Sequence, residues 1–300
     1  MKKVENMFIK TVLAFIMIGW SGCSTKVPNT LKSRLDTLPK ETLKLHAQIQ
    51  GTGAPVVLLH GFSSSLHTFS YMIEPLAKKY RVYALDLKGF GSSPKPRDAR
   101  YSVYDQMLLV KDFMTEHNIS NPIMIGHSLG AGVALSLAIT GVPLKKMVLL
   151  DAAAYRQTRP MLLDWMQIPV LGKLGFYLLP ARFEIKEGYK FAFYDDAKIP
   201  EKSVDILAKN LQSDNAKYAF ATANDCLIPD DIDEVSQKYR HITIPTLIIW
   251  GYEDIVIRRN KAYRLHRDMP NSKLVFIPKC GHLPQEERPQ ETLRAIEAFL

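Results

Sequence analysis

The stretch Gly126-His127-Ser128-Leu129-Gly130 constrains the fold of this chain more than any other part of the sequence. It follows the apolar run 122–125 and precedes a helix-forming run at 131–139. A serine between two such runs, with a glycine two residues away on each side, is typical of a nucleophile elbow. Glycines suit a turn so tight that larger side chains would clash. The pattern predicts that Ser128 stands above a sheet at the start of a helix.

Short apolar runs alternate with helical patterns over residues 41–154 and 241–300. Strands are expected at 43–50, 55–59, 81–85, 123–125, 146–150, 243–250 and 273–277, and helices at 66–79, 101–117, 129–140, 258–267 and 291–300. This alternation predicts an α/β domain with a mostly parallel sheet and helices on both faces. Residues 155–240 are rich in aromatics at helical spacing, which predicts a helical cap inserted after the strand that ends near Leu150.

Four further motifs accompany the elbow. They are His60-Gly61-Phe62, Asp86-Leu87-Lys88-Gly89-Phe90-Gly91-Ser92-Ser93, Trp250-Gly251-Tyr252-Glu253-Asp254, and Gly281-His282-Leu283-Pro284 with Glu287 and Pro289. With these motifs the chain resembles the α/β-hydrolase fold over essentially all of residues 43–300. In that fold the catalytic residues follow the chain order serine, acid, histidine. The resemblance implies a triad in the same order here.

Ser128, Asp254 and His282 are the candidate triad. A serine hydroxyl is a weak nucleophile and needs a base within hydrogen-bond reach. His282 would be that base, and later the acid that protonates the leaving group. Asp254 would fix the tautomer of the histidine and stabilise the imidazolium. Glu253, next in sequence, and Asp151, at a position from which some family members take their acid, are the alternatives.

The resemblance also implies an oxyanion hole made of two backbone N–H groups. One belongs to Leu129, just after the serine, and the other to Phe62, in the loop after the second strand. In this family the residues that correspond to His60 and His127 more often hold the loops around the elbow than act as bases. Asp86 and the glycine turn after it are expected to be structural for the same reason.

The N-terminus resembles a secreted lipoprotein. Residues 1–22 have a basic start and an apolar stretch at 11–20 that is too short to span a bilayer comfortably, as in a signal peptide. Ser21-Gly22-Cys23-Ser24 resembles a bacterial lipobox, which implies lipidation of Cys23 and a lipidated tether over residues 23–40. The implied location is the bacterial cell envelope, at the outer membrane facing the periplasm in a Gram-negative cell. An uncleaved anchor helix is the alternative.

Other classes of protein fit the sequence less well. The net charge of +9 is scattered over the chain rather than gathered on a recognisable module, which argues against nucleic-acid binding. The chain has no HExxH, CxxC or GxGxxG pattern, so neither a metal nor a dinucleotide cofactor is expected. Cys226 and Cys280 are expected to be unpaired.

Together these patterns predict a serine hydrolase, of the esterase or lipase kind, that cleaves a carboxylic ester with an apolar acyl or aryl group through an acyl-enzyme. A serine at the elbow excludes the dehalogenase and epoxide-hydrolase chemistries, which use aspartate there. C–C bond hydrolases of diketone acids and cofactor-free perhydrolases use the same triad and remain alternatives. A hydrolase-like ligand-binding or sensor protein is the alternative of another class.

Overall fold

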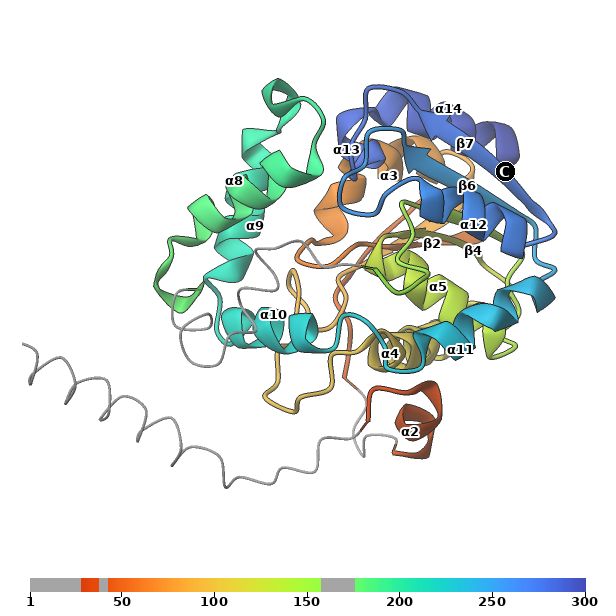
Figure 1. Ribbon diagram of the computed structural model, residues 1–300, viewed down its shortest axis with the longest axis horizontal. Helices are drawn as coiled ribbons and strands as arrows, with labels where there is room; N and C mark the ends of the chain where they lie inside the picture. The colour runs from red at the N-terminus through yellow and green to blue at the C-terminus, as the bar shows by residue number, and fades with distance from the viewer. Residues whose placement is uncertain (1–27, 38–42, 158–175) are drawn as a thin grey trace, which may run out of the picture.

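The apolar runs of the chain become the strands of one seven-stranded sheet (Figure 1). The computed structural model describes residues 28–37, 43–157 and 176–300. The strands are β1 (Ala47–Gln50), β2 (Ala54–Leu59), β3 (Tyr80–Leu85), β4 (Ile123–His127), β5 (Lys146–Leu150), β6 (Thr246–Gly251) and β7 (Ser272–Ile277). They lie in the order β1-β3-β2-β4-β5-β6-β7, and β1 runs antiparallel to β3 while the other neighbours are parallel.

Helices cover both faces of this sheet. One face is covered by α3 (Ser70–Ala77), which follows the short helix η1 (Leu66–Phe69), and by α14 (Pro289–Phe299), above the sheet in Figure 1. The other face is covered by α4 (Val103–Glu116), α5 (Leu129–Ile139) and α12 (Asn260–Asp268). Along β2, Val56 and Leu58 pack against the first set of helices and Val57 and Leu59 against the second. Because both faces are buried along β2, β4, β5 and β6, these strands consist mainly of apolar residues. The predicted α/β architecture is confirmed.

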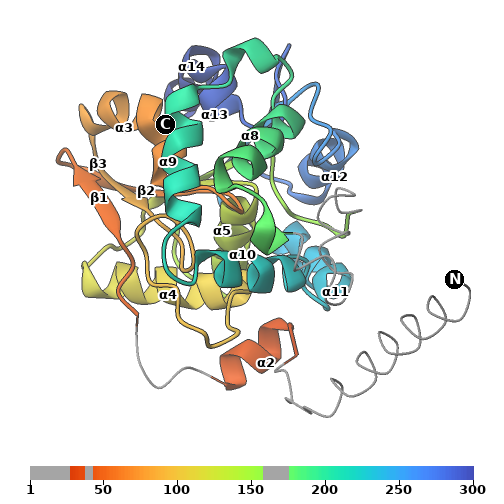
Figure 2. The ribbon, with the colours of Figure 1, turned by 90° about the vertical axis from the view of Figure 1, so that its left-hand side faces the viewer.

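The predicted helical insertion after Leu150 is also confirmed. Its described elements include α8 (Ala181–Ala192), η2 (Asp196–Lys198), α9 (Glu201–Leu211) and α10 (Ala216–Asp225). In Figure 2, α8 and α9 stand in front of the sheet. These two helices pack on each other through an apolar cluster that includes Ile185 and Val204, and Leu283 of the core joins the same cluster. The cap therefore has a core of its own that touches the loop after β7.

The helices just before β6 pack on the core rather than with α8 and α9. They are α11 (Ile232–Ser236) and η3 (Gln237–His241), in a stretch that the sequence assigns largely to the cap. Val235 and Tyr239 join the apolar cluster on the α5 face of the sheet, and the Tyr239 hydroxyl donates to the carbonyl of Ala154 at 2.9 Å. The part of the insertion that stands over the sheet thus ends before α11.

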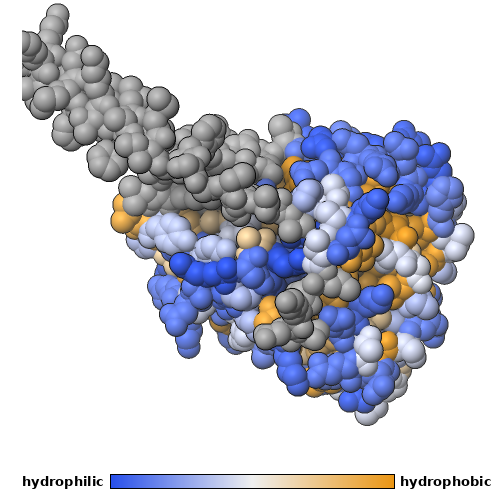
Figure 3. Space-filling view, turned by 90° about the horizontal axis from the view of Figure 1, so that it is seen from below, coloured by the Kyte–Doolittle hydropathy of each residue, from blue (hydrophilic) through white to orange (hydrophobic). Residues whose placement is uncertain are grey.

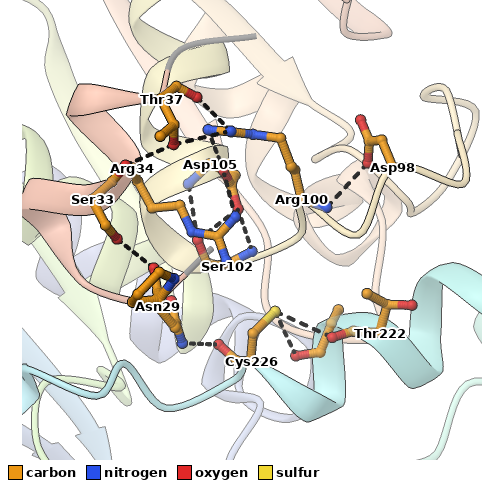
Figure 4. A network of polar contacts seen from close by, with 12 residues as sticks. Asn29, Ser33, Arg34, Thr37, Asp98, Arg100, Ser102, Asp105, Thr222 and Cys226 are labelled. Carbon is orange, nitrogen blue, oxygen red and sulfur yellow. Dashed lines mark hydrogen bonds and ion pairs between the residues drawn. The ribbon is translucent and has the colours of Figure 1, made fainter. Parts of the chain in front are cut away.

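Helix α2 (Leu31–Asp36) lies within the segment expected to be a tether, but it docks on the core (Figure 4). The side chain of Asn29 donates to the carbonyl of Cys226 at 3.0 Å. Arg34 is buried and pairs with Asp105 at 3.2 Å, and Asp105 also pairs with Arg100 at 3.1 Å. These partners come from distant parts of the chain, so residues 29–36 are ordered by tertiary contacts.

The predicted signal peptide and Cys23 lie outside the described residues. In the stretches that the structure describes, no helix is both long and apolar enough to cross a bilayer.

Candidate active site

Ser128 occupies the sharp turn between β4 and α5. Its φ of 49° and ψ of −112° are values that residues with side chains rarely adopt. A Cβ atom on Gly126 would lie 2.5 Å from the carbonyl oxygen of Gly130, and one on Gly130 would lie 2.1 Å from the carbonyl oxygen of Leu59. Strand and helix are therefore packed so closely that glycine is required on both sides of the serine. This backbone is that of a nucleophile elbow, with the serine at the positive end of the α5 dipole.

Asp254 and His282 come from the loops after β6 and β7, and the fold brings their side chains into contact. Nδ1 of His282 lies 2.8 Å from Oδ2 of Asp254, and both side chains are buried. The other oxygen of Asp254 accepts the N–H groups of Val256 and Ile257 at 2.7 and 3.0 Å. The carboxylate is thus held in one orientation, with Oδ2 turned toward the imidazole.

The loop that carries His282 rests against the elbow. The ring centroids of His127 and His282 are 4.9 Å apart, and Nε2 of His127 lies 2.7 Å from the carbonyl oxygen of His282. Burial, and then the neighbouring His282, lower the pKa of His127 well below its usual value. His127 is therefore neutral, and its Nε2–H donates to the carbonyl oxygen of His282. This is the structural role expected of it. This contact ties the loop of His282 to His127, the residue that precedes Ser128.

The two rival acids make other contacts. The carboxylate of Glu253 accepts a backbone N–H in the loop before His282 at 3.0 Å. Oδ1 of Asp151 accepts the N–H of Gly251 at 2.9 Å. Burial, and then the charge of Asp254, raise the pKa of Asp151 well above its usual value, which favours its neutral form. Among the described residues, the carboxylate at hydrogen-bond distance from His282 is that of Asp254.

The two expected oxyanion donors lie on either side of the serine. Leu129 is the first residue of α5, and N–H groups in the first turn of a helix have no acceptor within the helix. Phe62 follows Gly61, where an added Cβ atom would lie 3.2 Å from Cβ of Ser128. The loop that carries Phe62 therefore passes directly over the elbow, where a developing oxyanion would need a second donor.

His60 and Asp86, from the other motifs, stabilise the loops around the elbow through hydrogen bonds to the backbone. His60 accepts the N–H of Leu87 at Nε2, at 2.9 Å, and burial lowers the pKa of its ring. Asp86 accepts the N–H groups of Leu66 and Ser92, each at 2.8 Å. Both residues thus have the structural roles that the resemblance implied.

A small cavity lies between the cap and the core loops, next to Phe62. The ring of Phe62 contacts Phe90 of the core and Phe220 of the cap, with centroids 5.7 and 4.6 Å apart, and both of these rings line the cavity. Ile185 and Leu207 of the cap also line it. Its volume of about 20 Å³ is room for one water molecule. An acyl chain would enter only if cap side chains moved, and it would then meet a mainly apolar wall.

Asp151, Asp254 and His282 also form a group that could hold a metal ion, since one ligand atom from each lies within 4.8 Å of the others. The 2.8 Å separation of His282 and Asp254 is that of a hydrogen bond, so a shared proton explains the cluster. Cys226 and Cys280 are unpaired, as expected. Burial raises the pKa of both thiols, which makes a second nucleophile at Cys280 unfavourable.

The sequence did not indicate that the cap backbone touches the loop of His282. The N–H of His282 donates to the carbonyl of Ala192, and the N–H groups of Tyr194 and Asp195 donate to Glu287. Glu287 lies in the same sequence motif as His282, but its residue type does not indicate these contacts. Backbone contacts of this kind leave no trace in residue type, so only the folded chain reveals them.

Comparison with known proteins agrees with this fold. Residues 54–289 match the family model of the alpha/beta hydrolase fold. The uncharacterised hydrolase YugF of Bacillus subtilis (strain 168) is 30% identical over 251 residues, covering 82% of this chain and 89% of that protein. Lipase 3 of Moraxella sp. (strain TA144) is 25% identical over 313 residues, covering 95% of each chain.

Solved structures share the same fold. A meta-cleavage product hydrolase from Pseudomonas fluorescens IP01 superposes with a TM-score of 0.73 at 22% sequence identity, covering 86% of this chain and 94% of that one. This likeness extends over the cap as well as the sheet, since it covers most of both chains. The chain belongs to the alpha/beta hydrolase fold family.

Proposed function

We propose that the protein is a serine hydrolase that cleaves carboxylic esters through an acyl-enzyme on Ser128. The observation that carries the proposal is the buried pair of His282 and Asp254, 2.8 Å apart, beside a strained serine elbow. Strained backbone at a serine costs free energy that a purely structural turn has no reason to retain. An orienting acid, a base and an exposed nucleophile are the three parts that such chemistry needs.

The proposed reaction has two steps. Oγ of Ser128 attacks the ester carbonyl while Nε2 of His282 takes the hydroxyl proton, and the oxyanion forms between the N–H groups of Phe62 and Leu129. His282 passes the proton to the leaving alcohol, and the ester bond breaks to leave the acyl-enzyme. A water then loses a proton to His282 and attacks the acyl-enzyme; His282 returns that proton to Oγ of Ser128 as the bond to the acyl group breaks and the acid is released. Asp254 stays ionised throughout and stabilises each imidazolium.

The surroundings of Phe62 support the proposed substrate class. The rings of Phe62, Phe90 and Phe220 and the side chains of Ile185 and Leu207 favour an apolar acyl or aryl group over a charged one. The similarity to Lipase 3 over nearly the whole chain supports an ester or lipid substrate. At about 20 Å³ the cavity has no room for an acyl group until cap side chains move, so the acyl length that fits depends on that movement.

Fluorophosphonate labelling and ester hydrolysis test the proposal. We expect Ser128 to be labelled in the wild-type protein, and labelling to be lost in Ser128→Ala and strongly reduced in His282→Ala. A series of p-nitrophenyl esters of rising chain length, run beside a diketone acid and a peracid-forming assay, then separates an esterase from the other enzymes of this triad. Folded protein that neither labels nor turns over any ester would favour the binding or sensor alternative.

We also propose that the chain is a lipoprotein anchored at Cys23. Asn29, which is docked on the core, is six residues away, and six extended residues reach at most about 20 Å. The catalytic domain would then stay close to a membrane, with the side that carries α2 nearest to it. Figure 3, a view from the side of α2, shows many hydrophilic residues with hydrophobic patches between them, which fits a tethered domain better than an embedded one.

The anchor has its own test. Mass spectrometry of the mature N-terminal peptide should show acyl chains on Cys23, and Cys23→Ala should leave the protein unprocessed and unlabelled by radioactive palmitate. An unmodified cysteine within an intact N-terminus would instead support the uncleaved anchor helix.

A further inference from the structure

The backbone of His282 is held from two opposite sides. Its N–H donates to the carbonyl of Ala192, the last residue of α8 in the cap, at 2.6 Å. Its carbonyl oxygen accepts the Nε2 proton of His127, in the elbow, at 2.7 Å. The candidate base therefore sits at a junction between cap and core rather than on the core alone.

Glu287 joins the same two parts of the molecule. It is the last residue of α13 (Pro284–Glu287) and its side chain is buried. One carboxylate oxygen accepts the N–H of Gly281, next to His282, at 2.7 Å. The other oxygen accepts the N–H groups of Tyr194 and Asp195, just beyond the end of α8, at 3.1 and 2.9 Å. Glu287 therefore links the loop of His282 to the end of α8 through hydrogen bonds to three backbone N–H groups.

Gly281 shows how closely the two backbones approach. A Cβ atom at this position would lie 2.2 Å from the carbonyl oxygen of Ala192 and 2.9 Å from the nitrogen of Tyr194. Both of those atoms are backbone, so neither could turn aside as a side chain might. The end of α8 and the loop before His282 therefore pack with no room for any side chain between them.

We propose that Glu287 is a positioning residue that couples the cap to the catalytic histidine. It fixes the loop of Gly281 and His282 against residues 192–195, so His282 reaches its working position only while that end of α8 is docked. This inference rests on the proposed function, because it assigns Glu287 to the reaction of Ser128. A displacement of about 1 Å in a catalytic group can reduce the rate about 100-fold, so a link of this kind affects turnover directly.

Glu286 provides a matched control. It is also buried and also joins cap and core, since it accepts the hydroxyl protons of Thr68 at 2.5 Å and of Tyr189 at 3.1 Å. Its partners are side chains on η1 and α8, whereas Glu287 binds the backbone of the histidine loop directly. A change at Glu286 therefore weakens the same interface without releasing Gly281.

The test compares Glu287→Gln with Glu286→Gln in the full-length protein. The glutamine at 287 must turn its NH₂ group toward at least one backbone N–H, which breaks the link on that side. For hydrolysis of a p-nitrophenyl ester we expect kcat of Glu287→Gln to fall about 10- to 100-fold with little change in KM. For Glu286→Gln we expect kcat within about threefold of wild type, whatever its effect on thermal unfolding.

Two further measurements distinguish a specific effect on the loop of His282 from a general loss of folding. Gly281→Ala pushes the same contact apart while Glu287 is intact, and it should show the same loss of kcat at unchanged KM. Hydrogen exchange of residues 280–283 and 192–195 should be faster in Glu287→Gln but not in Glu286→Gln, and it can be measured even if no ester is hydrolysed.

The outcomes separate the two proposals. A wild-type protein in which Ser128 is neither labelled nor able to turn over esters overturns the proposed function, whatever the exchange data show. The role of Glu287 is overturned if the wild type is active and the two variants lose kcat equally. It is also overturned if Glu287→Gln keeps the full kcat of an active wild type. Slow exchange in Glu287→Gln, equal to that of wild type, also contradicts the link.

Discussion

Asp254→Asn is expected to remove most of the ester hydrolysis while leaving the fold intact. Oδ1 of Asp254 accepts the N–H groups of Val256 and Ile257, so an asparagine must place its carbonyl oxygen there. Its NH₂ group then faces Nδ1 of His282, 2.8 Å away in the wild type. Two donors cannot share that bond, so the imidazole proton moves from Nδ1 to Nε2. In this tautomer His282 cannot accept the proton of Ser128.

The size of the effect follows from the geometry of the pair. The carboxylate and the imidazolium that forms during the reaction have charge centres about 4 Å apart, which is worth about 4 kcal/mol at an effective dielectric constant of about 20. That energy corresponds to about 10³ in rate. The wrong tautomer adds to this loss, and the same substitution in serine proteases lowers kcat by about 10⁴. We therefore expect kcat/KM to fall by about 10³ to 10⁴.

The assay is steady-state hydrolysis of the best p-nitrophenyl ester, with thermal unfolding as the control for folding. Asp151→Asn is the matched variant, since Asp151 is also buried and close to His282 but is not hydrogen-bonded to it. It should keep at least about a third of the wild-type kcat/KM, because an amide resembles the neutral acid in size and charge. The orienting acid would not be Asp254 if Asp254→Asn retained more than a tenth of the wild-type kcat/KM. The same would follow if Asp151→Asn lost more of the wild-type kcat/KM than Asp254→Asn.

Three further predictions concern stability. The pKa of Asp151 is raised in the fold, so the unfolded chain loses this proton first as pH rises, and stability falls above the usual aspartate pKa of about 3.9. Asp151→Asn should therefore raise the melting temperature more at pH 7 than at pH 3. An equal change at both pH values would contradict a neutral Asp151. Gly130→Ala brings a Cβ atom against the carbonyl of Leu59 and should cost about 2–3 kcal/mol in urea unfolding, whereas a neutral result would rule out the tight elbow. Arg34→Met leaves the buried Asp105 with one partner fewer and should lower the free energy of unfolding by about 2 kcal/mol in the same assay. An unchanged free energy of unfolding would show that α2 is only loosely attached.

Local sequence was sufficient for the parallel sheet and the elbow. The runs at 147–150 and 247–250 are apolar because both faces of β5 and β6 are covered there, and such runs between helical patterns indicate parallel strands. Gly126 reflects a local contact between β4 and α5, and Gly130 reflects the close approach of α5 to Leu59 at the end of β2. The motif is recognisable from the sequence because all five of its residues are consecutive, although the contact with Leu59 joins distant parts of the chain.

Local sequence was not sufficient for α2. A helix of six residues is unstable in isolation, because nucleation costs more than so few hydrogen bonds return. Its order depends on Arg34 meeting Asp105 and on Asn29 meeting Cys226, far away in the chain. A polar stretch with two prolines is consistent with a tether until those partners are known.

The sequence by itself determined which residues could carry the chemistry, because Ser128, Asp254 and His282 each lie in a motif whose residue types and order are specific. Only the tertiary structure decided how they are held. The choice of Asp254 over Asp151 depends on two loop geometries and on burial, which turns one aspartate into a neutral acid. The link from Glu287 to the cap consists of side chain to backbone contacts across 92 to 93 residues of chain. Every residue except proline has the same backbone N–H group, so the pattern of side chains in the sequence could not have predicted these contacts.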